Sequence, residues 1–289
     1  MVPIATDKLL VIVGQTASGK SSLAMELAEE FNGEIICADS RTIYREANIG
    51  TAKPSIQDQK RIKHHLLDVV NIDEPFSVAD FKQLAVSSIA DILSRGKLPI
   101  LVGGSGLYID AVLYNFEFRP NKDNSIRETF KDASVEELQE ELLSRDIELP
   151  ENSRNKRYLI RSLEAGSQLQ KNRTIRDNTL IIGLDCEKEE IQQRSKLRAD
   201  TMFHDGIVDE IRRLVTKYGW DSSVMSAPAY VAFRYVLEGD RTPQEAALDC
   251  VDKDLKLAKK QRTWFKRNKQ INWIKSDQAQ GVVQQFLQK

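Results

Sequence analysis

Residues Gly14–Ser21 read Gly-Gln-Thr-Ala-Ser-Gly-Lys-Ser, which matches the pattern G-x-x-x-x-G-K-[ST] of a phosphate-binding loop. The apolar run Leu9–Val13 precedes this loop, and Leu23, Leu27 and Phe31 follow it at helical spacing. Between a strand and a helix, the backbone N–H groups of such a loop point at one small volume beside its lysine. The motif therefore predicts a phosphate or diphosphate site, and it leaves open whether phosphate is transferred, hydrolysed or expelled. The expected ligands are Gly14, Gln15, Thr16, Ala17, Ser18, Gly19, Lys20 and Ser21.

The composition is that of an ordinary soluble protein. The chain has 289 residues, of which 41% are hydrophobic and 29% charged, and its net charge is −1. Any binding of nucleic acid must therefore come from a local basic patch. Cys37, Cys186 and Cys250 are far apart, and we expect buried, reduced thiols. Because no signal peptide and no apolar run of transmembrane length is found, we expect a cytoplasmic protein that does not bind membranes.

Strand-like and helix-like segments alternate through the first part of the chain. The expected strands are Lys8–Val13, Glu34–Ala38 and Leu98–Val102, with a fourth at Thr179–Leu184. We expect helices at Ser21–Phe31 and Ser77–Arg95, and capping boxes at Ser134–Glu137 and Thr242–Glu245 open two more. This alternation predicts an α/β fold, a P-loop NTPase-like parallel sheet flanked by helices. The predicted catalytic core is 1–118 and 179–289, and 119–178 form an all-helical insertion domain.

Two groups of residues follow strands at the edge where the active groups of such a sheet gather. Asp39-Ser40 comes after the second strand, where an aspartate can hold Mg²⁺, orient a substrate or accept a proton; a helix N-cap is the alternative. The third strand ends in Gly103-Gly104, where many phosphate-loop enzymes carry an acidic residue. Glycines there suit the wall of a ligand channel or simply a tight turn.

Two further segments carry positive charge. Arg194 and Arg198 share one helical face and could clamp a phosphate, although a solvated face is the better interpretation of their spacing alone. The segment Lys256–Lys269 is rich in Lys and Arg, contains no acid and carries Trp264-Phe265. A basic face with aromatic residues favours contact with nucleic acid, and a solvated face whose aromatics join the core is the alternative. On the predicted helix, Lys259, Arg262, Lys266 and Lys269 lie near one face.

Together these segments resemble the bacterial tRNA dimethylallyltransferases, also called tRNA isopentenyltransferases. Besides the loop and Asp39-Ser40, the resemblance rests on Ile49–Pro54, His65–Asp68, Phe76–Phe81, Leu101–Tyr108 and Arg161–Glu164, and on Arg194, Arg198 and Met202. It closes with Ala258–Phe265, which contains the string Gln-x-Thr-Trp-Phe. The matches follow one another in the family's order over most of the chain.

The resemblance implies transfer of a dimethylallyl group from dimethylallyl diphosphate to N6 of adenosine 37, beside the anticodon, in tRNAs that read codons beginning with U. It implies that the loop amides, Lys20, Mg²⁺ and Arg198 stabilise the departing diphosphate, that Arg194 helps bind it and that the Ser21 hydroxyl holds Mg²⁺. Asp39 matches the family's catalytic aspartate and would accept the proton of the amine.

The same resemblance assigns the tRNA contacts. An extruded adenine would meet Asp39, Ser40, Arg41 and Thr42, and Ser105 would line the channel. The insertion and the basic helix would hold the anticodon stem-loop through Arg157, Tyr158, Arg161, Lys259, Arg262 and Trp264. Two departures from the family stand out: Tyr158 occupies a position where the family commonly has Arg, and Ser226–Tyr230 lacks the usual Ile-Gly-Tyr. We expect these departures to affect which tRNAs the protein prefers. Nothing in the sequence demands a partner subunit, and we expect a monomer.

Two other functions use the same loop. A small-molecule kinase of the nucleotide-kinase type would need an arginine-rich lid, and it has no use for the basic segment around Trp264. A nucleotide-dependent RNA-binding switch would usually carry an acidic Mg²⁺ ligand where Gly103-Gly104 stands.

Overall fold

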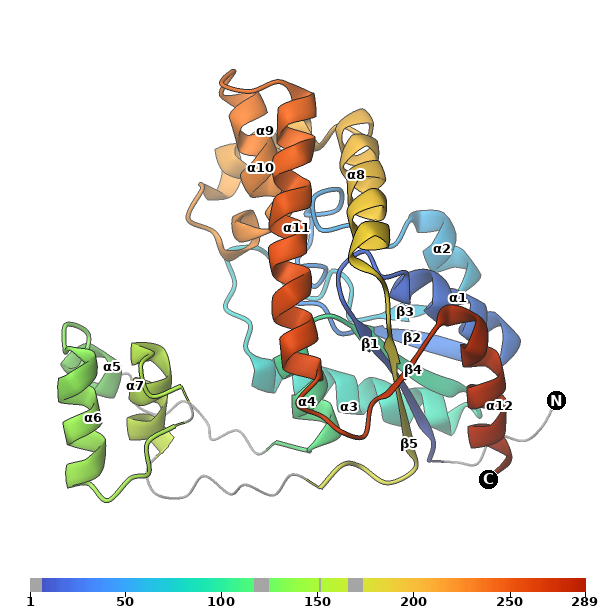
Figure 1. The fold of residues 1–289 in the computed structure, drawn as a ribbon, viewed down its shortest axis with the longest axis horizontal. Helices are drawn as coiled ribbons and strands as arrows, with labels where there is room; N and C mark the ends of the chain where they lie inside the picture. Colours follow the sequence, from blue (N-terminus) through green and yellow to red (C-terminus); the bar gives the residue numbers. More distant parts are fainter. Residues whose placement is uncertain (1–6, 117–124, 151, 166–173) are drawn as a thin grey trace. The chain divides into compact units, whose positions relative to one another are not determined.

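The computed structural model describes residues 7–116, 125–150, 152–165 and 174–289, which form two compact units. The larger unit comprises Met1–Asn115 and Ile175–Lys289, and the smaller comprises Phe116–Thr174 (Figure 1). The strands of the larger unit are β1 (Leu9–Gly14), β2 (Gly33–Cys37), β3 (His64–His65), β4 (Leu98–Gly103), β5 (Thr179–Leu184) and β6 (Asn272–Ile274). Its α-helices are α1 (Lys20–Glu30), α2 (Ile56–Arg61), α3 (Val78–Ser94), α4 (Gly106–Leu113), α8 (Lys188–His204), α9 (Ile207–Tyr218), α10 (Pro228–Leu237), α11 (Pro243–Phe265) and α12 (Ala279–Gln288).

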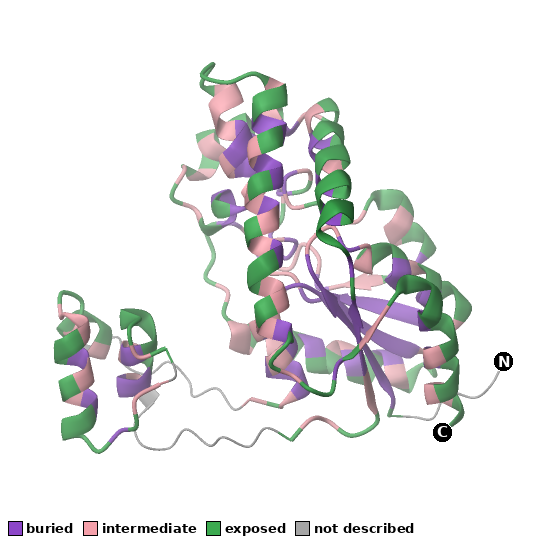
Figure 2. Ribbon diagram, viewed as in Figure 1, coloured by how far each residue is buried: buried purple, intermediate pink, exposed green. Residues whose placement is uncertain are grey.

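The strands form one parallel sheet in the order β3-β2-β4-β1-β5-β6. β1 lies between β4 and β5, and all six of its residues are buried, as expected for a strand covered on both faces (Figure 2). Alternate residues of β1 enter two different cores. Leu10 and Ile12 pack with α1 and α12, whereas Val11 and Val13 pack with α3 and α4. The loop after β1 is therefore held rigidly at the carboxyl edge of a fully buried strand.

The predicted α/β class and the parallel sheet are confirmed, and the bounds of the four expected strands agree within a residue. Both capping boxes are present, with the hydroxyls of Ser134 and Thr242 accepting the expected backbone N–H groups. Two short strands were not predicted. β3 and β6 have two and three residues, so the hydrogen bonds from β2 and β5 define them rather than a sequence pattern of their own.

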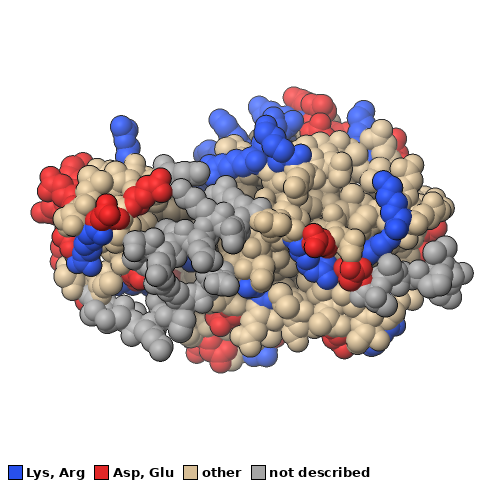
Figure 3. Space-filling model, turned by 90° about the horizontal axis from the view of Figure 1, so that it is seen from below, with Lys and Arg blue, Asp and Glu red and all other residues tan. Residues whose placement is uncertain are grey.

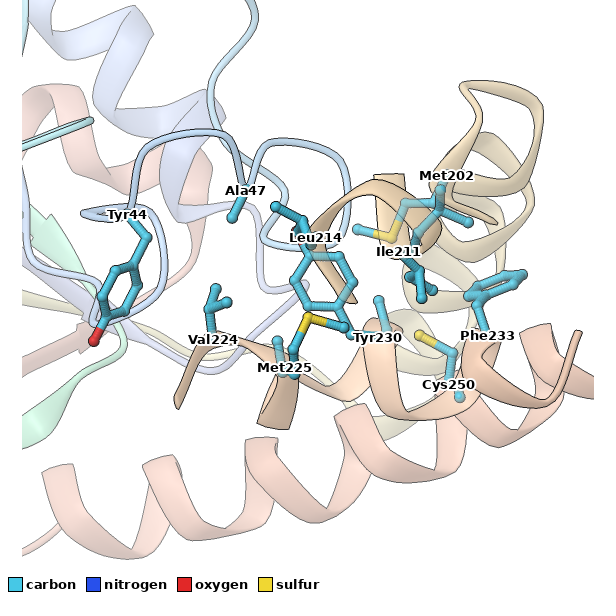
Figure 4. Packing of buried hydrophobic residues seen from close by; sticks show 14 of the residues in the cluster. Tyr44, Ala47, Met202, Ile211, Leu214, Val224, Met225, Tyr230, Phe233 and Cys250 are labelled. Carbon is cyan, nitrogen blue, oxygen red and sulfur yellow. The ribbon is translucent and has the colours of Figure 1, made fainter. Parts of the chain in front are cut away.

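The helices α8 to α11 form a separate core that also takes in the loop after β2. Tyr44 and Ala47 from that loop pack with Met202, Leu214 and Tyr230 (Figure 4). Glu210, almost completely buried, accepts hydrogen bonds from the backbone N–H groups of Asn48, Ile49 and Gly50. The phenol of Tyr230 donates to the same carboxylate at 2.7 Å. This helical core therefore fixes the segment that begins at Asp39.

The smaller unit is helical in its described residues. It contains α5 (Ser125–Thr129), α6 (Val135–Ser144) and α7 (Lys156–Ala165), which pack around Leu138, Leu142 and Leu159. Across the described ranges, no helix combines the length and apolar character needed to cross a bilayer.

Candidate active site

The phosphate-binding loop connects β1 to α1 through a tight turn. Ala17 and Gly19 adopt positive φ angles of 57° and 92°, and Gly19 is the N-cap of α1. The first N–H groups of a helix have no partner within the helix, so the start of α1 presents donors to a bound anion. Ser18 Oγ is buried there without a hydrogen-bond partner among the described residues. These features fit the predicted phosphate or diphosphate site.

Lys20 lies inside this loop, where Nζ donates a 2.7 Å hydrogen bond to the carbonyl of Gln15. Burial lowers the pKa of Lys20 to about 8, an effect that Asp39 opposes and Arg198 reinforces. This mutual influence indicates that Asp39, Lys20 and Arg198 share one electrostatic environment, although they come from three distant parts of the chain.

Arg194 and Arg198 reach the loop from α8. Arg194 Nη1 donates to the carbonyl of Ser18 at 3.0 Å, and Arg198 Nη2 donates to Thr16 Oγ1 at 3.2 Å. The spacing alone favoured a solvated helix face; Arg198 is half-buried instead, whereas Arg194 remains exposed although its Nη1 reaches the loop. Arg198 Nε is buried without a partner among the described residues, so the guanidinium keeps a donor for a ligand.

Asp39 follows β2 and organises the turn after it. Its Oδ1 accepts hydrogen bonds from the backbone N–H groups of Arg41 at 2.7 Å and Thr42 at 3.4 Å. These bonds form a local turn and not the helix N-cap of the alternative interpretation, since no helix follows Asp39. Among the described residues, none donates to Oδ2, so one oxygen orients the side chain while the other is left for a proton or a substrate amine.

Hydrogen bonds join the edges of three strands into one wall. Ser40 N–H donates to Ser105 Oγ at 3.0 Å, which joins the end of β2 to that of β4. Gln261 of α11 accepts from Thr16 N–H at 2.7 Å and donates to the carbonyl of Gly104 at 3.2 Å, which joins β4 to the loop after β1. Sequence reasoning gave Gln261 no role, since its partners lie far away along the chain.

The close approaches that Gly103 and Gly104 permit are to the protein itself. A Cβ on Gly103 would lie 1.9 Å from the carbonyl oxygen of Ala38, and one on Gly104 would lie 2.3 Å from Gln261 Nε2. Packing between β2, β4 and α11 therefore requires glycine at both positions, and their place in the wall of a ligand channel stays a prediction.

Two residues expected at the base site turn into the protein. The guanidinium of Arg41 donates to the carbonyl of Ser223 at 2.6 Å and to Ser226 Oγ at 2.8 Å. Thr42 is buried, and its hydroxyl has no partner among the described residues. Arg41 thus contacts Ser226, the first residue of the segment in which the sequence departs from the family. A change in that segment can therefore alter the position of Arg41 beside Asp39 and Ser40.

The basic helix presents only part of the predicted surface. α11 ends at Phe265, because Lys266 and Arg267 enter a turn that leads to β6, so Lys266 and Lys269 are not on its face as predicted. Lys259 is exposed, whereas Arg262 donates to Asp185 at 3.2 Å. Figure 3 shows Lys and Arg side chains in several groups over the face drawn there, the largest of them near its upper edge.

Trp264 has a structural role that the sequence did not reveal. Its Nε1 donates to Asp110 at 2.9 Å, and a Cβ on Gly106 would lie 2.3 Å from its ring. Phe265 is buried in the core that β1 shares with α3 and α4, as the alternative interpretation predicted. Trp264 still lines a shallow pocket of about 260 Å³, together with Lys259, Lys260, Thr263 and Arg267. Its contact with tRNA stays a prediction.

In the smaller unit, the predicted contacts lie on α7. Arg157, Tyr158 and Arg161 are all exposed, whereas Leu159 and Leu163 face the core of that unit. Their side chains are therefore accessible within the unit.

Ser21 carries the hydroxyl that the resemblance to the family assigns to Mg²⁺. It is exposed in the first turn of α1. In the part of the chain that the structure describes, no group of three His, Cys, Asp or Glu side chains could hold a metal ion. That donor set fits Mg²⁺ bound mainly by diphosphate oxygens and water, which is how this ion usually binds beside phosphates.

The cysteines also match expectation, since all three are buried and unpaired. The two neighbouring histidines of β3 have protein partners: His64 Nδ1 lies 2.8 Å from the carbonyl oxygen of Ile62, and His65 Nε2 lies 2.7 Å from Glu34 Oε2.

Similarity to known proteins agrees with this geometry. The tRNA dimethylallyltransferase of Acetivibrio thermocellus is 38% identical over 292 residues, with 94% of this chain and 93% of the relative aligned. That of Oceanobacillus iheyensis is 36% identical over 288 residues, with 94% and 92% aligned. The solved structure of the full-length tRNA isopentenylpyrophosphate transferase of Bacillus halodurans has a TM-score of 0.74 at 31% identity, covering 98% of this chain and 97% of that one.

A eukaryotic dimethylallyltransferase acting on tRNA shares the fold, with a TM-score of 0.80 at 24% identity over 93% of this chain and 74% of that one. The sequence pattern of the family described as IPP transferase matches residues 42–268, which is most of the chain. The chain therefore belongs to the IPP transferase family.

Proposed function

We propose that this protein transfers a dimethylallyl group from dimethylallyl diphosphate to N6 of adenosine 37 in tRNAs that read codons beginning with U. Membership of the family and relatives named tRNA dimethylallyltransferase support tRNA prenylation. The observation that carries the proposal is the convergence of Lys20, Arg194 and Arg198 on one loop, with Asp39 in the same electrostatic environment.

Three cations around one loop suit a diphosphate leaving group. As the bond between the allylic carbon and the diphosphate oxygen breaks, negative charge accumulates on the diphosphate. Lys20, the start of α1 and the free donors of Arg198 would stabilise that charge. Mg²⁺, held by Ser21 and the diphosphate, would supply additional neutralisation when bound.

Asp39 suits the acceptor side of the same reaction. The N6 amine of adenine forms a new bond to the allylic carbon and must then lose a proton. Asp39 Oδ1 is fixed by the N–H groups of Arg41 and Thr42, so the proton would go to Oδ2. Ser105, held by Ser40, would line the path between adenine and donor.

The tRNA would be held by cationic side chains in both units. Lys259 with its neighbour Lys260, and Arg157 with Arg161, are exposed and suited to phosphate groups. Tyr158, beside them on α7, offers a ring on which a base can stack. We further propose that the protein acts in the cytoplasm as a monomer.

The experiment that tests this function uses labelled dimethylallyl diphosphate, Mg²⁺ and total tRNA, with ATP and small acceptors in parallel. Label should enter tRNA, and digestion should place it on the adenosine beside the anticodon. Asp39→Asn should abolish transfer while tRNA binding persists, because asparagine can still accept the N–H of Arg41. The matched control, Asp73→Asn, changes an exposed acid and should leave transfer intact. Phosphoryl transfer from ATP without labelled tRNA would refute the proposal.

A further inference from the structure

The deepest charged contact near the phosphate-binding loop involves a residue that the reaction above does not use. Asp254 lies on α11 and is 2% exposed. Its Oδ2 accepts a hydrogen bond from Arg198 Nη2 at 2.5 Å and a second one from the hydroxyl of Ser195, which is itself fully buried. A carboxylate in such a place is costly unless it is paired and hydrogen-bonded, and here both requirements are met.

Asp254 acts on the arginine that faces the donor site. The nitrogen that it binds, Arg198 Nη2, also donates to Thr16 Oγ1 at 3.2 Å. The guanidinium is thus held between α11 and the loop, with Nε buried and still without a partner among the described residues. An arginine side chain is flexible, and a planar guanidinium recognises a phosphate only when its orientation is right.

We propose that Asp254 is a positioning residue for the transfer reaction, which holds the Arg198 guanidinium in the orientation that stabilises the departing diphosphate. The inference rests on the proposed function for the role of Arg198. Asp254 is buried and bonds to Arg198 and Ser195, so its effect on the donor would pass through Arg198. Ser195 contributes by fixing the carboxylate from the preceding turn of α8.

Inorganic diphosphate and an unreactive analogue of the donor together distinguish a residue that positions Arg198 for the reaction from one that only helps to bind the donor. Released diphosphate carries more negative charge than its ester, so it reports the interactions that strengthen as the bond breaks. Asp254→Asn should lower the single-turnover rate constant for tRNA prenylation about tenfold or more and weaken the binding of inorganic diphosphate about fivefold. The affinity for a non-hydrolysable thiolodiphosphate analogue of the donor should change less than about twofold.

The decisive measurement is a double-mutant cycle with Arg198→Gln. In the Arg198→Gln background, Asp254→Asn should change neither the rate constant nor diphosphate affinity by more than about twofold, because the group it positions has gone. A variant that merely damaged the fold would lower both quantities in either background, and that result would overturn the inference. Ser195→Ala, which leaves the Arg198 pair in place, should reproduce the same pattern more weakly.

A matched control is available on the same helix. Asp249 of α11 pairs with Arg241 and Lys253 away from the loop, and Asp249→Asn should leave both rate and affinity unchanged. A wild-type rate with Asp254→Asn refutes the positioning role and leaves the proposed function standing. Absence of transfer by the wild-type protein refutes the proposed function instead. In that case the affinity for inorganic diphosphate, measured by calorimetry on the same four proteins of the double-mutant cycle, still decides whether Asp254 positions Arg198.

Discussion

The backbone N–H of Thr16 donates a 2.7 Å hydrogen bond to Oε1 of Gln261, which lies 245 residues further along the chain. Through its amide nitrogen the same side chain binds the carbonyl of Gly104 at 3.2 Å. Gln261 therefore ties the phosphate-binding loop, the end of β4 and α11 together. A helix whose outer side is cationic is thereby attached directly to the donor site.

Replacing Gln261 tests this attachment. Gln261→Leu removes both hydrogen bonds, each worth about 0.5–1.5 kcal/mol, and should lower kcat/KM for prenylation about tenfold with a modest fall in Tm. Steady-state kinetics and thermal unfolding measure the two effects. Gln285→Leu, on the exposed side of α12, is the control and should match the wild type. Unchanged kinetics in Gln261→Leu would show that the tie is irrelevant to transfer.

The side chain of Lys20 should titrate within an accessible pH range. Burial, the main cause, together with Arg198 lowers its pKa to about 8, so in the free protein the ammonium is lost as pH rises through this value. NMR of the lysine side chains should show one resonance with a midpoint near pH 8, assigned by its absence in Lys20→Met. Asp39 raises the pKa of Lys20, so Asp39→Asn should move the midpoint to lower pH. An ordinary midpoint near 10.4 would contradict the buried environment.

Glu34 should make the fold sensitive to acid. It is 2% exposed and bound by Arg95, His65 and Lys97 at the far end of β2 from Asp39. Hydrogen bonds, above all from Arg95, hold the pKa of this carboxyl well below its usual range against the opposing effect of burial. Because the folded pKa is below the unfolded value of about 4.3, the stabilisation is complete above about pH 5 and is lost as pH falls further.

The variant Glu34→Gln isolates this contribution. At pH 7 it should lower the free energy of unfolding by about 1.5–3 kcal/mol, since it removes the carboxylate that accepts hydrogen bonds from Arg95 and Lys97, which are themselves partly exposed. Its stability should also depend less on pH between about 3 and 5. Denaturant unfolding across that range provides the measurement, with the surface pair variant Glu238→Gln as control. Parallel pH profiles for Glu34→Gln and wild type would refute the assignment.

The exposed lysines of α11 should contribute to the salt dependence of tRNA binding. Lys259→Ala with Lys260→Ala should weaken binding and reduce the slope of log K against log salt by about 1–2, because each phosphate contact releases about one counterion. Arg262 is left unchanged, since its contact with Asp185 would confuse the result. Lys196→Ala, an exposed lysine of α8, serves as control. An unchanged slope would show that these lysines are solvated and do not contact tRNA phosphates.

Gly106 and Trp264 provide a packing test. Gly106→Ala would bring a methyl group to 2.3 Å from the indole and should destabilise the fold by about 1–3 kcal/mol. The control is Gly281→Ala in α12, where no atom lies within 4 Å of the added Cβ. That substitution should instead stabilise by about 0.5–1 kcal/mol, because alanine is the better helix former. Equal effects of the two changes would contradict the contact.

Local patterns were sufficient for the parts of the fold that depend on neighbouring residues. The buried runs at β1, β2, β4 and β5 and the capping boxes at Ser134 and Thr242 were predicted, because each signal lies within a few residues. The short edge strands β3 and β6 were not, since their pairing depends on strands elsewhere. The helical end at Phe265 was also missed, because the turn that follows it serves the pairing of β6 with β5.

By itself, the sequence determined the phosphate-binding loop, the strand-and-helix alternation that places it at a sheet edge, and Asp39 at that edge. Only the tertiary structure decided what surrounds the loop. It brought Arg194 and Arg198 from α8, Gln261 and Asp254 from α11, and it turned Arg41 inward to Ser223. The reason is physical: loop conformation and strand propensity are local, whereas a buried side chain takes its partners from elements brought beside it by packing.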